Sequence, residues 1–139
     1  MSLSVFTDGG AIGNPGPAAI GVVVKKDGQT IKELAKYLGE TTNNVAEYKA
    51  VIEALSWIKA HRFLLSCFFS PINFFLDSRL VVNQLNGLFK IKDAKLRNLV
   101  IKVRELEREV GFKVVYHHIP RKRNKEADFL VKQILSEKR

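Results

Sequence analysis

Hydrophobic and polar residues in the first forty positions follow the pattern of a β-meander. Two apolar runs, 3–7 and 18–26, are typical of strands and are separated by a turn rich in glycine and proline. The Asp27-Gly28 pair that follows is a strong hairpin signal and predicts antiparallel pairing. In the next run, 30–39, apolar residues recur at helical spacing, yet the preceding hairpin favours a third strand, and we assign one.

The periodicity then becomes helical. From Asn43 to about Ala60, apolar residues recur every three or four positions, which predicts an amphipathic helix capped by Thr42 or Asn43. Residues 72–76 are continuously apolar, as expected of a short strand buried on both faces in a parallel arrangement. The remaining pattern predicts a short helix at about 79–86, a long helix at 93–110, a strand at 112–119, and a helix that Asn124 caps and that runs to about Leu135.

The predicted elements follow the order βββαβααβα. A meander followed by alternating helices and strands indicates an α/β fold. We expect a mixed five-stranded sheet, with three antiparallel strands and then parallel ones, and helices on both faces. A length of 139 residues suits one domain with its own hydrophobic core, so residues 1–139 are expected to form a single domain.

The excess of basic over acidic residues favours negatively charged binding partners. The chain carries 23 Lys and Arg against 14 Asp and Glu, a net charge of +9. Such a surface attracts polyanions, either nucleic acid or an anionic membrane surface. The alternative interpretation is that the charge serves solubility alone.

Other features of the composition argue against disulfides, zinc and membrane insertion. Cys67 is the single cysteine, which excludes an internal disulfide framework, disfavours a cysteine-based zinc site and predicts a reducing, cytoplasmic location. We interpret Cys67 as a core residue. The most apolar stretch, residues 63–76, is shorter than the roughly 20 residues of a spanning helix, and the N-terminus lacks the pattern of a secretory signal.

Four acidic residues occupy positions where acids are unusual. Asp8 and Asp77 each follow an apolar strand, Glu47 lies on the helix face expected to pack on the sheet, and Asp128 lies beside the apolar stripe of the last helix. Individually, each has a structural explanation as a turn residue, a helix cap, a flanking residue or a complement to a helix dipole. Together they indicate a carboxylate cluster, because burying a lone carboxylate is costly unless it is paired or bound to a cation.

A cluster of this kind requires counter-charge. Neighbouring carboxylates repel one another, and oxygen ligands favour hard divalent ions, Mg²⁺ above all, whereas a Cys or His-rich ligand set, which zinc prefers, is lacking. Paired Mg²⁺ ions about 4 Å apart can activate a water molecule and stabilise the leaving oxygen of a phosphodiester. A basic surface around such an acidic centre is typical of a nuclease.

Four segments of the chain are distinctive: FTDGGAIGNPGPAAIGVVV, TTNNVAEYKAVIEAL, DSRLVVNQLNG and HIPRKRNKEADFLV. In this order, they resemble the successive motifs of type 1 ribonucleases H. The resemblance implies the ribonuclease H-like fold and an endonuclease, and we expect a monomer. Its activity would be hydrolysis of the RNA strand of RNA/DNA hybrids by water, giving 3′-hydroxyl and 5′-phosphate ends. It also implies two Mg²⁺ ions, replaceable by Mn²⁺. The implied metal ligands, the same acids that the burial argument selects, are Asp8, Glu47, Asp77 and Asp128.

The resemblance further implies positions that bind the substrate. In the family, the turn after the first aspartate and the T-N-N segment meet the minor groove of the hybrid. The matching residues here are Gly10, Gly13, Asn14, Asn43 and Asn44. Their amides and backbone groups suit 2′-hydroxyls, which distinguish RNA from DNA.

The sequence departs from the family pattern in two places. Many bacterial members have a basic helical protrusion that grips the DNA strand, whereas residues 85–98 lead directly into the long helix. The basic residues expected to replace it in part are Lys90, Lys92, Lys95 and Arg97. The auxiliary histidine of the family has a counterpart in His118, but this residue lies in a predicted strand. Arg121 is the second candidate for contact with the leaving phosphate.

Two alternative functions stay open at this stage. Without the protrusion, the same fold could act on double-stranded RNA, or the chain could be a catalytically silent module that binds nucleic acid. Binding alone gives no reason to retain four mutually repelling carboxylates, so the nuclease is favoured.

Overall fold

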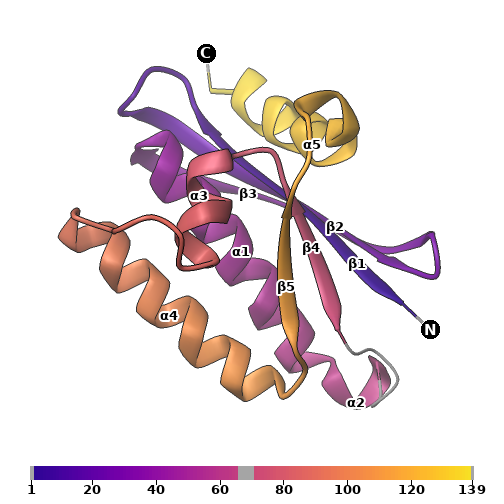
Figure 1. The fold of residues 1–139 in the computed structure, drawn as a ribbon. Helices are drawn as coiled ribbons and strands as arrows, with labels where there is room; N and C mark the ends of the chain where they lie inside the picture. Colours follow the sequence, from indigo (N-terminus) through magenta and orange to yellow (C-terminus); the bar gives the residue numbers. More distant parts are fainter. Residues whose placement is uncertain (1, 66–70, 139) are drawn as a thin grey trace.

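The computed structural model describes residues 2–65 and 71–138 and contains one mixed sheet (Figure 1). The expected role of Cys67 lies outside the described residues. The strands are β1 (Leu3–Ala11), β2 (Gly16–Lys26), β3 (Gln29–Thr41), β4 (Ile72–Leu76) and β5 (Val114–His118). Their order is β3-β2-β1-β4-β5. The first three pair antiparallel, β4 is parallel to β1, and β5 is parallel to β4. The predicted sheet is confirmed, including the strand in the ambiguous run 30–39.

Helices cover both faces of this sheet, as expected (Figure 1). The helices are α1 (Asn43–Ala60), α2 (Arg62–Leu65), α3 (Arg79–Leu85), α4 (Ala94–Val110) and α5 (Lys125–Ser136), with a 3₁₀ turn, η2, at Arg121–Arg123. One face carries α1, with α4 packed against it, and the other carries α5, which packs mainly on β2, β1 and β3. The short elements α2 and η2 were not predicted. Among the described residues, every helix is too short or too polar to cross a bilayer.

The main hydrophobic core lies between α1 and the sheet. Its largest fully buried side chains include Tyr48, Leu55 and Phe74. Thr42 caps α1, since its hydroxyl oxygen accepts a hydrogen bond from the Val45 N–H at 3.2 Å. The cap therefore fixes the start of α1 next to the end of β3.

The first strand is longer than predicted. β1 continues through Asp8 to Ala11, and Asp8 pairs with Gly21 of β2. Asp8 is therefore inside a strand rather than after one, which corrects the prediction that the strand ends at residue 7. Pairing with β2 carries this extension. Within it, Gly9 lets α1 approach the strand closely: a Cβ atom at Gly9 would lie 2.3 Å from the main-chain carbon of Ala46.

The strand β4 is buried on one face only, contrary to the prediction of burial on both. Asn73 and Phe75 point to the second face, which is only half-buried. This face is half-buried because α5 covers mainly β2, β1 and β3. On that face, the Phe75 ring stacks between the rings of Phe6 and His117, with centroids 4.9 and 5.0 Å apart. A row of aromatic rings takes the place of a covering helix.

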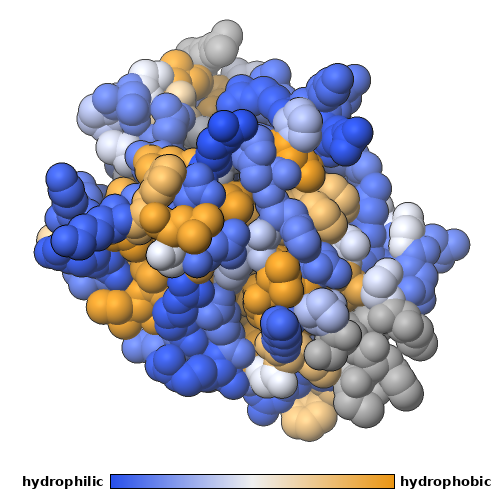
Figure 2. All heavy atoms as spheres, viewed as in Figure 1, coloured by the Kyte–Doolittle hydropathy of each residue, from blue (hydrophilic) through white to orange (hydrophobic). Residues whose placement is uncertain are grey.

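The segment between α3 and α4 is compact. Residues 86–93 join the two helices directly, in agreement with the predicted loss of the protrusion. Leu88 and Phe89 are exposed in this segment. In Figure 2, hydrophobic side chains gather over α3 and this connection and are bordered by hydrophilic ones.

Candidate active site

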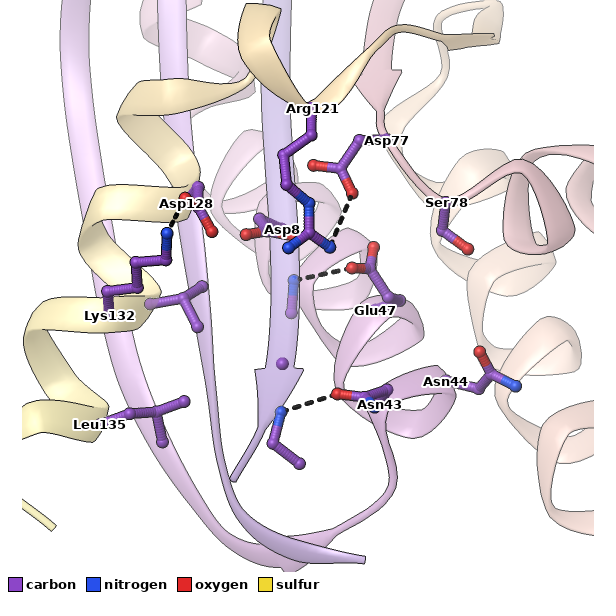
Figure 3. A pocket seen from close by; sticks show the side chains of 14 residues that line it. Asp8, Asn43, Asn44, Glu47, Asp77, Ser78, Arg121, Asp128, Lys132 and Leu135 are labelled. Carbon is purple, nitrogen blue, oxygen red and sulfur yellow. Dashed lines mark hydrogen bonds and ion pairs between the residues drawn. The ribbon is translucent and has the colours of Figure 1, made fainter. Parts of the chain in front are cut away.

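Three carboxylates converge at one edge of the sheet (Figure 3). Asp8 comes from β1, Glu47 from the second turn of α1, and Asp77 from the residue after β4. One carboxylate oxygen from each lies within 4.8 Å of the others. Asp8 and Glu47 are only 3% and 5% exposed. This arrangement confirms that three of the four predicted acids form a cluster suited to a metal ion.

The order of the strands explains why these acids meet. β1 and β4 are parallel neighbours whose last pair is Thr7 with Leu76, so the next residues, Asp8 and Asp77, leave the ladder at the same edge. Glu47 reaches this edge from α1, where its Oε1 accepts a hydrogen bond from the Gly9 N–H at 3.2 Å. Ser78 caps α3 by accepting from the Val81 N–H. Capping therefore does not account for Asp77.

The fourth acid, Asp128, lies on α5 and lines the same pocket. It is not part of the group within 4.8 Å, and its Oδ2 pairs with the Lys132 ammonium at 2.9 Å. Figure 3 shows Asp128 across the pocket from Glu47, with Asp8 between them. The structure thus brings all four predicted acids to one pocket, with Asp128 at its border.

The electrostatics of the cluster favour a bound cation. Burial and then the charge of Asp77 raise the pKa of Asp8 to about 7. Burial and then the charge of Asp8 raise the pKa of Glu47 well above its ordinary value. Glu47 Oε2 is buried without a hydrogen-bond partner among the described residues. An unpartnered buried oxygen beside two further carboxylates fits a hard divalent ion.

Only part of the predicted substrate-binding set lines the pocket. Gly10, Asn43 and Asn44 do, whereas Gly13 and Asn14 are not among its described lining residues. Asn14 instead supports Asn43: its Oδ1 accepts from the Asn43 N–H at 2.9 Å. The Asn43 Oδ1 in turn accepts from the N–H of the last residue of β1 at 2.8 Å. These bonds join the turn after β1 to the start of α1.

The two auxiliary candidates occupy different places. Arg121 lines the pocket, and its guanidinium lies 4.0 Å from Asp77 Oδ1. Figure 3 shows the Arg121 side chain reaching over the cluster toward Asp8. His118 is the last residue of β5, is exposed, and is not among the described residues that line the pocket. The geometry therefore favours Arg121 over His118.

Two polar residues at this site were missed as functional candidates. Lys132 follows Asp128 by four positions, so its pairing with Asp128 follows from helical spacing alone. Asn124 was predicted as a helix cap, but among the described residues no side chain caps α5. Instead, the Asn124 amide contacts Asp77. Nothing in the sequence distinguishes an asparagine that caps a helix from one that binds a neighbouring strand.

Comparison with known proteins places this site in a family. Residues 6–134 match the family described as reverse transcriptase-like. The chain is 40% identical over 134 residues to a ribonuclease HI of Halobacterium salinarum. The matched region covers 95% of this chain and 63% of that protein. The chain thus spans less than two thirds of the length of this curated relative.

Solved structures give a closer match in length. LC11-RNase H1, isolated from compost by a metagenomic approach, superposes with a TM-score of 0.91 at 40% identity and covers 98% of this chain and 96% of that one. A structure of LC11-RNase H1 in complex with an RNA/DNA hybrid superposes with a TM-score of 0.87 at 41% identity, covering 94% of each chain. The chain therefore belongs to the type 1 ribonuclease H family.

Proposed function

We propose that this chain is a metal-dependent endonuclease that hydrolyses the RNA strand of RNA/DNA hybrids and leaves 3′-hydroxyl and 5′-phosphate ends. The observation that carries the proposal is the buried cluster of Asp8, Glu47 and Asp77, whose oxygens lie within 4.8 Å of one another. The structure of the LC11 relative with an RNA/DNA hybrid supports the choice of substrate.

Asp8, Glu47, Asp77 and Asp128 are the residues that would hold two Mg²⁺ ions, with Mn²⁺ as a substitute. Bound there, the ions supply activation of the attacking water and stabilisation of the leaving oxygen. The protein contributes one acid from each of four segments, β1, α1, the end of β4 and α5, and the fold holds these acids together against their mutual repulsion. That repulsion disfavours the charged state of the empty cluster, so divalent ions and folding stabilise each other.

The remaining side chains around the pocket suit a phosphate backbone. Arg121 and Lys132 place two cations beside the acids, where they can contact phosphate oxygens of the cleaved strand. Gly10, Asn43 and Asn44 also line the pocket. Their backbone and amide groups would contact 2′-hydroxyls in the minor groove, which gives a physical basis for choosing RNA over DNA.

A direct test compares four end-labelled substrates: RNA/DNA hybrid, double-stranded RNA, single-stranded RNA and duplex DNA. Each is incubated with Mg²⁺, with Mn²⁺ and with EDTA. We expect cleavage of the RNA strand of the hybrid with either ion. The variants Asp8→Asn and Asp77→Asn should lose this cleavage while keeping the fold, because the substitutions are isosteric.

The same assay separates the alternatives. Preferential cleavage of double-stranded RNA would mean that the chain is a nuclease whose substrate is double-stranded RNA rather than the hybrid. Binding of the hybrid without cleavage in either ion would contradict the proposal and favour a silent binding module.

A further inference from the structure

Asn124 is the most deeply buried polar residue in the connection before α5. It lies between η2 and α5 and is 1% exposed. Its side-chain Nδ2 donates two hydrogen bonds, to the main-chain oxygen of Thr7 at 2.8 Å and to Asp77 Oδ2 at 2.9 Å. Both partners are acceptors only, so the amide nitrogen must face them.

The Asn124 side-chain amide links β1 to the end of β4 at the point where the pairing of these two strands stops. The parallel ladder of β1 and β4 ends with the pair Thr7 and Leu76. One step further, the Asn124 side chain bridges the carbonyl of the Thr7-Asp8 peptide and the carboxylate of Asp77. The distance between the two strand ends is thereby fixed where the two acids leave the sheet.

Helix capping does not explain the asparagine. Its backbone has φ −112° and ψ 31°, outside the extended conformation that side-chain capping uses, and no described side chain caps α5. The Asn124 Oδ1 is buried without a partner among the described residues. The residue therefore carries an unpaired acceptor while both Nδ2 hydrogens are used, which indicates that the donor side is the part required.

The main chain of Asn124 reaches the fourth acid. Its carbonyl oxygen accepts the first helical hydrogen bond of α5, from the Asp128 N–H at 3.0 Å. One residue thus contacts the peptide of Asp8, the carboxylate of Asp77 and the backbone of Asp128. Three segments that are distant in sequence meet at this point.

We propose that Asn124 is a positioning residue that sets the spacing and orientation of Asp8, Asp77 and Asp128 for metal binding. A hydrogen bond from Nδ2 to Oδ2 restricts rotation of the Asp77 carboxylate and leaves Oδ1 on the side of the pocket where Arg121 lies. Residues that orient metal ligands in this way typically change metal affinity or activity by about 10- to 100-fold when removed. The inference rests on the proposed function of the four acids.

The test measures Mn²⁺ binding by isothermal titration calorimetry without nucleic acid, together with kcat and KM for hybrid cleavage. The variants are Asn124→Ala, which removes the amide, and Asn124→Asp, which keeps its shape but replaces the donor by an acceptor. Asn73→Ala is the matched control, because Asn73 lies on β4 and its amide oxygen contacts His117 at 2.9 Å rather than a carboxylate.

We expect Mn²⁺ affinity to fall about 10- to 100-fold in Asn124→Ala, with kcat lowered and KM for the hybrid within about twofold of wild type. Asn124→Asp should lose kcat as well, because both donated bonds disappear, and Asn73→Ala should match wild type in every measurement. Mn²⁺ affinity and kcat of Asn124→Ala equal to those of Asn73→Ala would overturn the inference.

A measurement on the wild type is independent of whether the variants fold. The Asn124 side-chain amide resonances should shift during a Mg²⁺ titration with the same midpoint as the Asp8 and Asp77 backbone signals. Resonances that stay unchanged would also overturn the inference. If the wild type binds Mn²⁺ yet cleaves no hybrid, the proposed function fails alone; if it cleaves hybrid and Asn124→Ala does so equally well, this inference fails alone.

Discussion

Asp8 illustrates how one residue can be costly for folding and necessary for a site. Its carboxylate is almost fully buried, faces Asp77 and has a pKa raised to about 7. In the unfolded chain the same group has its ordinary pKa of 3.8. Between about pH 4 and pH 7, Asp8 is therefore protonated in the folded protein without metal but ionised in the unfolded chain. Stability is lost as the pH rises through this window.

This difference predicts the behaviour of Asp8→Asn in EDTA. The amide needs no proton to stay neutral, so the variant should melt several degrees above wild type at pH 8, and the gap should shrink toward pH 5. Thermal unfolding followed by circular dichroism at both pH values measures it. The control Glu137→Gln removes an exposed acid at the end of α5 and should show no such dependence on pH. A gap independent of pH would show that Asp8 is ionised throughout.

A second residue-scale prediction separates the two auxiliary candidates. Arg121 lies over the carboxylates and His118 does not line the pocket. Loss of a charge-assisted contact to phosphate costs about 1.5 to 3 kcal/mol, so Arg121→Ala should lower kcat about 10- to 100-fold in a steady-state hybrid cleavage assay. His118→Ala should stay within about twofold of wild type. The reverse ranking would assign the auxiliary role to the histidine.

At the scale of elements, the site depends on how closely α1 approaches β1. Gly9 contacts the backbone of α1 at Ala46, next to Glu47. A Cβ atom at the neighbouring Gly10 would meet only the Val131 side chain, at an ordinary distance of 3.5 Å. The two adjacent glycines therefore serve different purposes.

These distances predict that one alanine variant is destabilised and the other is close to wild type. Gly9→Ala should destabilise the protein by about 3 kcal/mol or more, since a Cβ atom 2.3 Å from the Ala46 backbone forces α1 away from the sheet. Gly10→Ala should fall within about 1 kcal/mol of wild type. Urea unfolding of both variants gives the comparison. Equal midpoints would mean that α1 can shift without cost.

The elements also show where sequence patterns suffice. The helical stripe of α1 and the hairpin at Asp27-Gly28 are local signals, and both predictions are confirmed. The extension of β1 past residue 7 depends on pairing with β2, which a local pattern does not contain. The half-buried face of β4 likewise depends on where α5 packs. Tertiary packing decides these cases.

At the scale of the molecule, a net positive charge is combined with an acidic pocket. The net charge is +9, while the four acids line one pocket. The sequence predicted these acids because each was anomalous for its element and all four matched family motifs. It could not predict Asn124, whose partners Thr7 and Asp77 lie 117 and 47 positions away. Only the folded topology brings them together.

The exposed lysines of residues 86–93 offer a test of how the chain would hold an RNA/DNA hybrid. If Lys90 contacts a phosphate of the hybrid, Lys90→Ala should raise Kd and reduce the slope of log Kd against log salt by about 1, since one fewer counterion is released. Lys113→Ala is the matched control: Lys113 is also exposed but immediately precedes β5, at the edge of the sheet opposite to the carboxylates. Fluorescence polarisation with labelled hybrid in Ca²⁺, over a range of KCl, gives both slopes. Equal slopes for the two variants would mean that the segment between α3 and α4 contributes only to the general field of the molecule.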